Sequence, residues 1–249
     1  MKYYSTNRLA PLATLEEAVV KGLAGDKGLY MPEKIKALPS SFFEKMKDMS
    51  FQEISYVVAD AFFGEDVDAD TLKQIVYDTL PFDAPVVHVN NSIYSLELYH
   101  GPTLAFKDVG GRFMARLLGH FIRKQGKKEV NVLVATSGDT GSAVANGFLG
   151  VPGIHVYVLY PKGKVSPIQE CQFTTLGQNI TALEIEGTFD DCQALVKTAF
   201  MDKELNAHMQ LTSANSINVA RFLPQAFYYF YAYAQLAKMG KADNLVFCV

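Results

Sequence analysis

The stretch that predicts the fold most directly is VNVLVATSGDTGS, residues 130–142. Its first six residues form a short apolar run rich in β-branched side chains, which is typical of a buried strand. A glycine-containing turn follows and opens a helix that runs through Phe148. The sequence therefore predicts a strand, a tight turn and a helix in direct succession, as at the start of a βαβ unit.

The same alternation continues on both sides of this stretch. Strands are expected at 86–89, 93–98, 154–159, 180–185 and 245–249, and helices at 109–124, 166–176, 190–200 and 223–238. Strands that alternate with helices form right-handed βαβ units. We therefore expect an α/β fold with a parallel or mostly parallel sheet and flanking helices.

The last of these helices is unusually rich in phenylalanine and tyrosine. Pro224 is expected in its first turn, with the helix beginning near Phe222, because proline is not tolerated in a helix interior. Its aromatic residues point in nearly all directions around the axis. This indicates deep burial, with a subunit contact as the alternative.

The first 85 residues show a different, mainly helical pattern. Helices are expected at 15–20, 42–46 and 51–63, and after a capping signal at 70–71. Thr14 and Glu17 have the spacing of a capping box at the first of these helices. The pairs Leu80-Pro81 and Ala84-Pro85 then interrupt the helical pattern. The sequence thus predicts a mainly helical N-terminal region, 1–85, before an α/β domain, 86–249.

Composition argues against several classes of protein. The chain has 249 residues, 49% of them hydrophobic, and a formal net charge of −3, so we expect a packed core and no nucleic acid or membrane partner. The densest basic cluster, 124–128, is interpreted as a solvated helix end and turn. The start lacks a signal-peptide core, and no apolar stretch is long enough to span a membrane. Three cysteines, with Cys192 on an apolar helical stripe, and the lack of metal-binding motifs predict a soluble cytoplasmic protein without a metal.

A lysine with unusual neighbours lies in the segment HGPTLAFKDVGGRFM, residues 100–114. A Gly-Pro turn redirects the chain, and Lys107 follows three apolar residues just before a helix. Desolvation by these neighbours disfavours the ammonium form, so a neutral, nucleophilic amine becomes accessible. Gly110 and Gly111 would let another group approach the start of the helix closely. The alternative is an ordinary surface lysine at a helix start that Asp108 caps.

The turn at 135–142 predicts a second kind of site. A strand, a turn of small residues and a helix start bring backbone N–H groups together, and these suit a carboxylate or a phosphate. The turn is neither the Gly-x-Gly-x-x-Gly dinucleotide motif nor a P-loop, because no lysine follows its last glycine. The alternative is a well-capped helix start without a ligand.

Four segments, in order, resemble the pyridoxal-phosphate-dependent threonine synthase family. They are HGPTLAFKD with GGRFM at 100–114, TSGDTG at 136–141, YPKGKVSP at 160–167 and SANSINVAR at 213–221. The early segment GLYMP, 28–32, is similar to the N-terminal region of that family. The similarity covers essentially the whole chain. It implies the fold of the fold type II pyridoxal-phosphate enzymes, with residues 86–249 as the cofactor and substrate domain.

The resemblance implies a reaction and the residues that perform it. O-phospho-L-homoserine and water would become L-threonine and phosphate, with pyridoxal 5'-phosphate held as a Schiff base on Lys107 and with Phe106 beside it. The freed Lys107 amine would then act as general base and acid. The substrate carboxylate would accept hydrogen bonds from Ser137, Gly138 and Thr140. The substrate phosphate would bind to Arg221, with Asn215, Ser216 and Lys164 alongside.

Three further polar residues of these segments receive supporting roles. Asp139 is expected to cap a helix or to accept a hydrogen bond from a neighbour, because its charge would repel the substrate carboxylate. Arg112 is either a second cation of the site or a structural ion-pair partner. His100 is expected to form a hydrogen bond in its turn, in preference to shuttling protons.

In this family the strand corresponding to 245–249 leads into a glycine-rich loop that binds the cofactor phosphate, and a further domain follows. The sequence stops before both, so the resemblance implies an N-terminal part of such an enzyme, which alone would bind the cofactor weakly and form no threonine. Two alternatives remain open. Another fold type II lyase, such as a serine/threonine dehydratase or a cysteine synthase relative, would not need the cationic group at Arg221. A catalytically inactive ligand-binding module would not need a reactive lysine.

Overall fold

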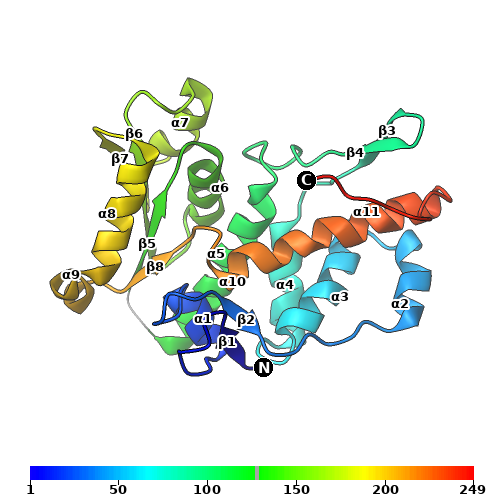
Figure 1. The fold of residues 1–249 in the computed structure, drawn as a ribbon, viewed down its shortest axis with the longest axis horizontal. Helices are drawn as coiled ribbons and strands as arrows, with labels where there is room; N and C mark the ends of the chain where they lie inside the picture. The colour runs from blue at the N-terminus through cyan, green and yellow to red at the C-terminus, as the bar shows by residue number, and fades with distance from the viewer. Residues whose placement is uncertain (127–128) are drawn as a thin grey trace.

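The main sheet consists of four parallel strands at the centre of one half of the molecule (Figure 1). The structure is a computed structural model that describes residues 1–126 and 129–249. The strands are β5 (Val130–Ala135), β6 (Ile154–Pro161), β7 (Ile180–Ile185) and β8 (Leu211–Ser213), in the order β7-β6-β5-β8. The predicted α/β fold with a parallel sheet and flanking helices is therefore confirmed.

Strand β5 lies in the interior of this sheet, with neighbours on both sides. All six of its residues are buried, as its continuous apolar sequence predicts for a central parallel strand. It pairs along its whole length with β6, from Val130 opposite Ile154 to Ala135 opposite Leu159. On its other side it pairs with the three residues of β8. The short strand β8 was missed from the sequence, because two of its three residues are a threonine and a serine.

Helices cover both faces of the sheet (Figure 1). They are α6 (Asp139–Phe148), α7 (Pro167–Thr174), α8 (Phe189–Met201) and α9 (Lys203–His208). Helix α6 lies on one face of β5 and β6 and α8 on the other. The chain runs from β5 to β6 to β7, then crosses back to place β8 on the far side of β5. Cys192 of α8 is fully buried in the cluster between α8 and the sheet, as predicted.

The N-terminal region is mainly helical, as predicted. Its elements are β1 (Tyr3–Ser5), α1 (Leu15–Lys21), β2 (Tyr30–Pro32), α2 (Ser40–Lys45), the 3-10 turn η1 (Met46–Asp48), α3 (Phe51–Phe63) and α4 (Ala69–Thr79). The Thr14–Glu17 capping box of α1 is present. The cap predicted at 70–71 was misplaced by two residues: Asp68 caps α4 by accepting a hydrogen bond from the Thr71 N–H.

The long helix α5 (Lys107–Gln125) joins this region to the sheet. One hydrophobic cluster includes residues of α1, α3 and α4 together with those of α5, β5 and β6. The Phe63 and Phe113 rings, for example, are 5.1 Å apart. Arg112 donates hydrogen bonds to the carbonyl oxygens of Asp78 and Thr79 at the end of α4, so it has a structural role that is not an ion pair. The boundary proposed at residue 85 stays a prediction, and the core is continuous across it.

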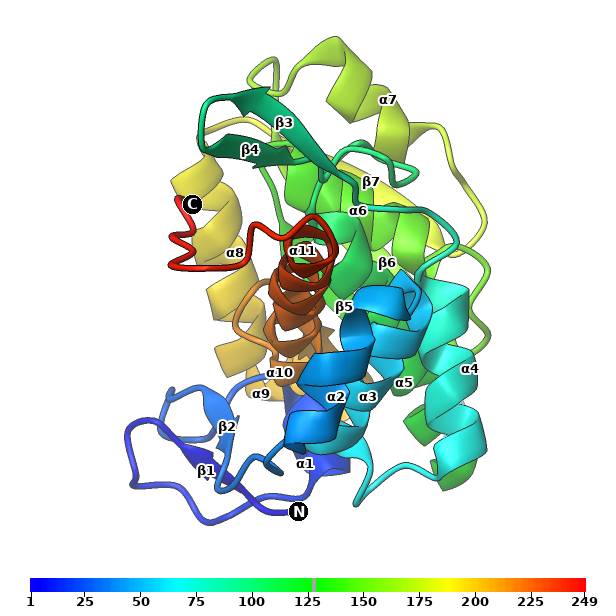
Figure 2. The same ribbon diagram turned by 90° about the vertical axis from the view of Figure 1, so that its right-hand side faces the viewer.

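A hairpin and a broken helix complete the fold. The hairpin is formed by β3 (Val86–Asn90) and β4 (Ile93–Leu96), and the helical segments are α10 (Val219–Phe222), the 3-10 turn η2 (Leu223–Gln225) and α11 (Ala226–Lys238). Figure 2 looks along α11, with the hairpin above it. The single helix predicted at 223–238 is thus preceded by a 3-10 turn that accommodates Pro224. Phe227 and Tyr228 are buried, whereas Tyr229 is exposed, so the predicted burial holds for only part of the aromatic residues.

The strand predicted at 245–249 is wrong, because these residues have no strand pairing. Their apolar sequence is explained by packing instead: Leu245 packs against the cluster of Val86, Ala232 and Leu236, and the edge of the Phe247 ring meets Tyr229. Of the basic cluster 124–128, Lys127 and Lys128 lie outside the described residues. Helix α5 ends within this cluster, at Gln125, with Gly126 in the left-handed conformation as its cap. Within the described residues, no helix combines the length and apolarity needed to cross a membrane.

Candidate active site at the carboxyl ends of the strands

The polar segments predicted to bind ligands lie after the carboxyl ends of β5, β6 and β8. Since the strands are parallel, these ends share one edge of the sheet. The strand order reverses between β5 and β8, which is the position where open α/β sheets bind ligands. The loops after these two strands contain the predicted substrate residues Ser137, Gly138, Thr140, Asn215 and Ser216.

The turn after β5 is held rigidly by its own polar groups. The Thr136 hydroxyl oxygen accepts hydrogen bonds from the N–H groups of Gly138 and Gly141, at 3.0 and 2.8 Å. Gly138 has φ 145°, and a side chain there would collide with Gln169, so only glycine fits. Thr136 thus takes up the Gly141 N–H in the first turn of α6, whereas the N-cap residue Gly138 contributes no side chain. The anion site that the sequence predicts at this terminus stays a prediction.

The other residues of this turn have different exposures. Ser137 is exposed at the edge, Thr140 is partly buried and Gly138 is buried. The Asp139 carboxylate accepts a hydrogen bond from the Gln169 side-chain amide of α7, which confirms that it is engaged by a neighbour. Gln169 had no distinguishing signal in the sequence.

Lys107 is the first residue of α5 and is partly buried. Burial lowers the pKa of its amine; nearby Asp139 acts in the opposite direction and Arg221 in the same direction. Its Nζ lies 5.5 Å from the centre of the Phe106 ring. Burial thus makes the neutral amine more accessible, which is the direction that the sequence predicts. The alternative of a capped surface lysine is wrong in one respect: Asp108 is fully buried and caps no N–H of α5.

Asp108 instead closes the turn that precedes Lys107. Its carboxylate accepts hydrogen bonds from the Thr103 N–H at 2.9 Å and from the Thr103 hydroxyl at 2.5 Å. A side chain at Gly101 would collide with this carboxylate. Between these residues Leu104 has φ +58°, which is uncommon for a residue with a side chain. Burial raises the pKa of Asp108, and the Thr103 contacts oppose this effect.

Arg221 of α10 lies beneath the start of α5 and is fully buried. Its Nη1 donates to the Lys107 carbonyl oxygen at 3.1 Å, whereas its Nε and Nη2 have no hydrogen-bond partner among residues 1–126 and 129–249. Burial lowers the pKa of Arg221 to about 10, with Asp108 opposing, so the guanidinium is charged at neutral pH. A buried cation with two unused donors is costly unless another group satisfies them. These two nitrogens are therefore candidate donors to an anion beside Lys107.

The groups that approach Gly110 and Gly111 closely, as predicted, belong to two other helices of the protein. A methyl group at Gly110 would overlap the carbonyl oxygen of Arg221 and meet its Nη1 at 2.5 Å. At Gly111 it would lie 2.8 Å from the carbonyl oxygen of Ala143 in α6. The two glycines thus let α10 and α6 pack directly on the first turn of α5.

Gly110→Ala is therefore expected to lower the free energy of unfolding, by about 1–3 kcal/mol, the usual cost of overpacking a core. Denaturant unfolding would measure it. Gly119→Ala on the same helix is the matched control, because its methyl group would meet only the side chains of Val151 and Arg123, at 3.1 and 3.3 Å. Equal stability of the two variants would contradict the tight contact between α10 and α5.

The remaining predicted substrate residues are Asn215, Ser216 and Lys164, and they differ in their contacts and exposure. The Asn215 side-chain amide donates to the Ala135 carbonyl oxygen at 3.2 Å, which links the ends of β8 and β5. Ser216 is exposed beside it. Lys164 is exposed after β6. Hydrogen bonds from Thr188 lower the pKa of Asp191 at the start of α8, and the charge of Lys164 adds a smaller contribution. Within the described residues no hydrogen bond or ion pair joins Lys164 to Lys107 or Arg221.

His100 contacts a residue close to it in sequence. His100 Nε2 lies 2.8 Å from the Glu97 carboxylate, so it forms a hydrogen bond near its turn, as predicted. In the part of the chain that the structure describes, no three His, Cys, Asp or Glu side chains converge as a metal site would require.

A cleft of about 740 Å³ opens at the same edge of the sheet. This volume lies within the usual range for small-molecule sites. Its walls come from the loop after α1, from α8 and from the strand ends, where Ala135, Ser213 and Asn215 line it. Neither Lys107 nor Arg221 lines this cleft. Of the predicted substrate residues, Asn215 lines it.

Comparison with known proteins places this geometry in a family. Residues 79–249 match the model of the family described as pyridoxal-phosphate dependent enzyme, and residues 2–80 match that described as threonine synthase N terminus. The chain belongs to the family of pyridoxal-phosphate-dependent enzymes. Within it, the chain is similar to threonine synthases: 46% identical to that of Escherichia coli strain K12 over 99% of this chain, and 47% identical to that of Haemophilus influenzae over 100% of it.

Solved structures agree with this relationship. The crystal structure of threonine synthase from Escherichia coli matches with a TM-score of 0.87 and 46% identity, covering 95% of this chain and 54% of that one. The pyridoxal-phosphate-bound threonine synthase from Brucella melitensis matches with a TM-score of 0.86 and 35% identity, covering 97% and 57%. The chain spans 57% of the length of the two curated relatives.

Proposed function

We propose that these residues form part of a threonine synthase active site, which converts O-phospho-L-homoserine and water into L-threonine and phosphate with pyridoxal 5'-phosphate. The observation that carries the proposal is the buried Arg221, whose Nε and Nη2 lack partners next to Lys107. These two nitrogens form one edge of the planar guanidinium, and such an edge binds phosphate in a bidentate manner. A substrate phosphate would satisfy both donors.

The residues present fit the cofactor as well. An amine that reacts with an aldehyde must be neutral, and burial lowers the pKa of Lys107. Lys107 would hold pyridoxal phosphate, with Phe106 beside it. When bound, the cofactor supplies an electron sink for carbanions.

Each side chain then has a specific task toward the substrate. Lys107 would move protons at the substrate Cα and Cβ, which requires an amine that is neutral when it accepts a proton. The turn at 137–140 would orient the carboxylate through Ser137, Gly138 and Thr140. Arg221 would bind the phosphate as it departs, because a fixed cation stabilises developing negative charge. Its proposed partners in this task are Asn215, Ser216 and, more remotely, Lys164.

Two other functions would use the site differently. A dehydratase or cysteine synthase relative acts on substrates without a γ-phosphate, and would leave the two free donors of Arg221 unused. An inactive ligand-binding module would give no reason for a buried lysine beside a buried arginine. Release of phosphate and L-threonine from O-phospho-L-homoserine by the holoenzyme tests the proposal. Deamination of L-serine or L-threonine without phosphate release from O-phospho-L-homoserine would favour the first alternative.

The reactivity of Lys107 provides an independent test. Because its pKa is lower in the folded protein, the neutral amine should appear at lower pH than in the unfolded chain. Trinitrobenzenesulfonate should therefore modify Lys107 in the cofactor-free folded protein at lower pH than in urea, as followed by peptide mapping. Pyridoxal phosphate should protect Lys107 and leave exposed Lys197 reactive. An identical pH dependence in folded and unfolded protein would argue against the site.

A cytoplasmic location and a small-molecule substrate, with no nucleic acid or membrane as partner, complete the proposal. Cys171, Cys192 and Cys248 are all free thiols, which suits a reducing compartment.

A further inference from the structure

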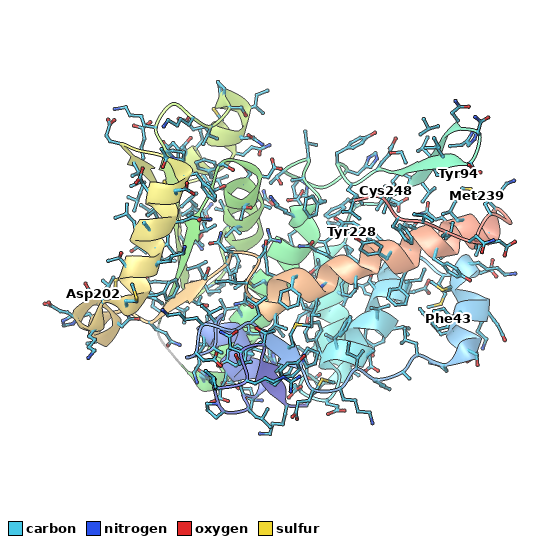
Figure 3. The ribbon with its side chains drawn as sticks, in the orientation of Figure 1. Phe43, Tyr94, Asp202, Tyr228, Met239 and Cys248 are labelled. Atoms are coloured by element: carbon cyan, nitrogen blue, oxygen red, sulfur yellow. The ribbon has the colours of Figure 1, made fainter. Side chains whose placement is uncertain are left out.

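Tyr228 of α11 is buried and contacts the backbone just before Lys107. Its hydroxyl donates a hydrogen bond to the Phe106 carbonyl oxygen at 2.9 Å. Its ring stacks on Phe51 of α3, with the centroids 6.0 Å apart. Figure 3 labels Tyr228 on α11. One side chain thus joins α3, α11 and the turn that carries the lysine, across 122 residues of sequence.

The turn before Lys107 is not held by apolar burial. Leu104 is 65% exposed and Phe106 41% exposed. Leu104 also has a positive φ, and Phe106 begins α5 without a side-chain cap. Exposed apolar residues and an unfavourable backbone angle leave this turn little stability of its own. It needs contacts from elsewhere to keep one conformation.

Four side chains provide this support. Asp108 of α5 accepts two hydrogen bonds from Thr103, and Arg221 donates to the Lys107 carbonyl oxygen at 3.1 Å. Gln172 of α7 donates to the Thr103 carbonyl oxygen at 3.4 Å, at the far end of the turn. The Tyr228 hydroxyl bonds Phe106, directly before Lys107. Since Arg221 has the proposed task of binding phosphate, Tyr228 is the contact from another helix that lies nearest to Lys107 and has no other assigned role.

We propose that Tyr228 is a positioning residue for Lys107, which fixes the first turn of α5 through its hydrogen bond to Phe106. The inference rests on the proposed function of Lys107. A lysine that moves protons at two neighbouring carbon atoms must be placed accurately, because displacements of about 1 Å can cost roughly a hundredfold in rate. The long lysine side chain is flexible, so the accuracy depends on where its backbone is held.

The charges around Lys107 link its position to its protonation. Asp139 of α6 favours the ammonium form and Arg221 of α10 disfavours it, while Asp108 lies next to Lys107 on α5. Burial raises the pKa of Tyr228, so its hydroxyl remains a protonated donor. A looser turn would expose Lys107 to water, which removes part of the desolvation that lowers its pKa, and would increase its distance from Arg221, whose charge also lowers it. Both changes raise the pKa of the amine.

Tyr228→Phe in the holoenzyme tests the proposal, with Tyr231→Phe as the matched control. Tyr231 lies on the same helix and stacks on the same Phe51 ring, with the centroids 4.5 Å apart, but its hydroxyl meets Asp83. Each variant therefore loses one hydroxyl and keeps its ring. We expect kcat to fall roughly fivefold to tenfold in Tyr228→Phe, the equivalent of one buried hydrogen bond, with KM little changed.

The deciding measurement is the pH dependence with which Lys107 reacts with pyridoxal phosphate, followed by absorbance in protein freed of cofactor. In Tyr228→Phe the midpoint should move to higher pH, whereas in Tyr231→Phe it should match the unmodified protein. A lower Tm in Tyr228→Phe without a change in midpoint would overturn the proposal, as would equal midpoint shifts in both variants. If Lys107→Ala retained the absorbance band of lysine-bound cofactor, the proposed function of Lys107 would itself be wrong. The results for the two tyrosine variants test only the role of Tyr228, so the two failures can be told apart.

Discussion

Replacing Lys107 by alanine is expected to abolish the absorbance band of lysine-bound cofactor and to lower kcat by about a thousandfold or more. The loss is large because one amine has two tasks, holding the cofactor and moving protons, and a general acid–base group alone contributes about 10²–10⁴-fold. Absorbance spectra and threonine formation by the holoenzyme would measure both effects. The fold should persist, since Lys107 is only partly buried.

Lys197→Ala is a suitable control, because Lys197 is an exposed residue of α8 at the border of the neighbouring cleft. It should retain the absorbance band. Borohydride reduction of the holoenzyme should leave the pyridoxyl group on the peptide that contains Lys107. Recovery of that group on another lysine would refute the assignment of the site.

Replacing Arg221 by methionine is expected to lower kcat/KM for O-phospho-L-homoserine about tenfold to a few hundredfold. A charge-assisted contact to phosphate contributes roughly 1.5–3 kcal/mol, and about 1.4 kcal/mol corresponds to a factor of ten in rate. Methionine retains much of the volume and removes a buried charge with two unpaired nitrogens, so the free energy of unfolding should stay level or rise. Arg221→Lys should rescue only part of the rate, because a point charge cannot replace the bidentate fork.

Arg112→Met is the matched control for this experiment. Arg112 is an arginine of α5 whose contacts are the two carbonyl oxygens at the end of α4. Its replacement should lower the free energy of unfolding and leave KM for the phosphorylated substrate unchanged. The opposite pattern, in which Arg221→Met destabilises the protein and leaves kcat/KM near that of the unmodified enzyme, would assign Arg221 a purely structural role.

Sequence patterns predicted the parts of the fold that depend on local composition. The β-branched run at 130–135 and the alternation after it specify a parallel sheet, because a strand buried on both faces needs continuous apolar residues. The same reasoning missed one short strand and predicted another that does not form. Three residues at 211–213 are too few and too polar to stand out, yet pairing with β5 makes them a strand. Residues 245–249 have a strand-like composition, but they find an apolar surface and no pairing partner.

Some of the proposed site residues could likewise be recognised in the sequence, and others could not. Lys107 and the turn at 137–140 could be proposed from the sequence, because the residues that suggest their chemistry are adjacent in the chain. The burial of Arg221 and its contact with Lys107 could not, since 114 residues separate the two in sequence. Tyr228 was hidden among several tyrosines of one helix, and only the folded chain distinguishes the hydroxyl that meets Phe106.

The continuous core around α5 also determines how substitutions far from Lys107 would affect the site. Phe63 of α3 packs on Phe113, and α5 begins at Lys107 only six residues earlier. Regions that share one core unfold together, so the N-terminal helices and the reactive lysine form one cooperative unit. A substitution deep in α3 would therefore reduce the fraction of molecules that contain a formed site, while each folded molecule kept its full rate. Inherited changes at core positions such as Phe63 would act through the abundance of folded protein rather than through chemistry.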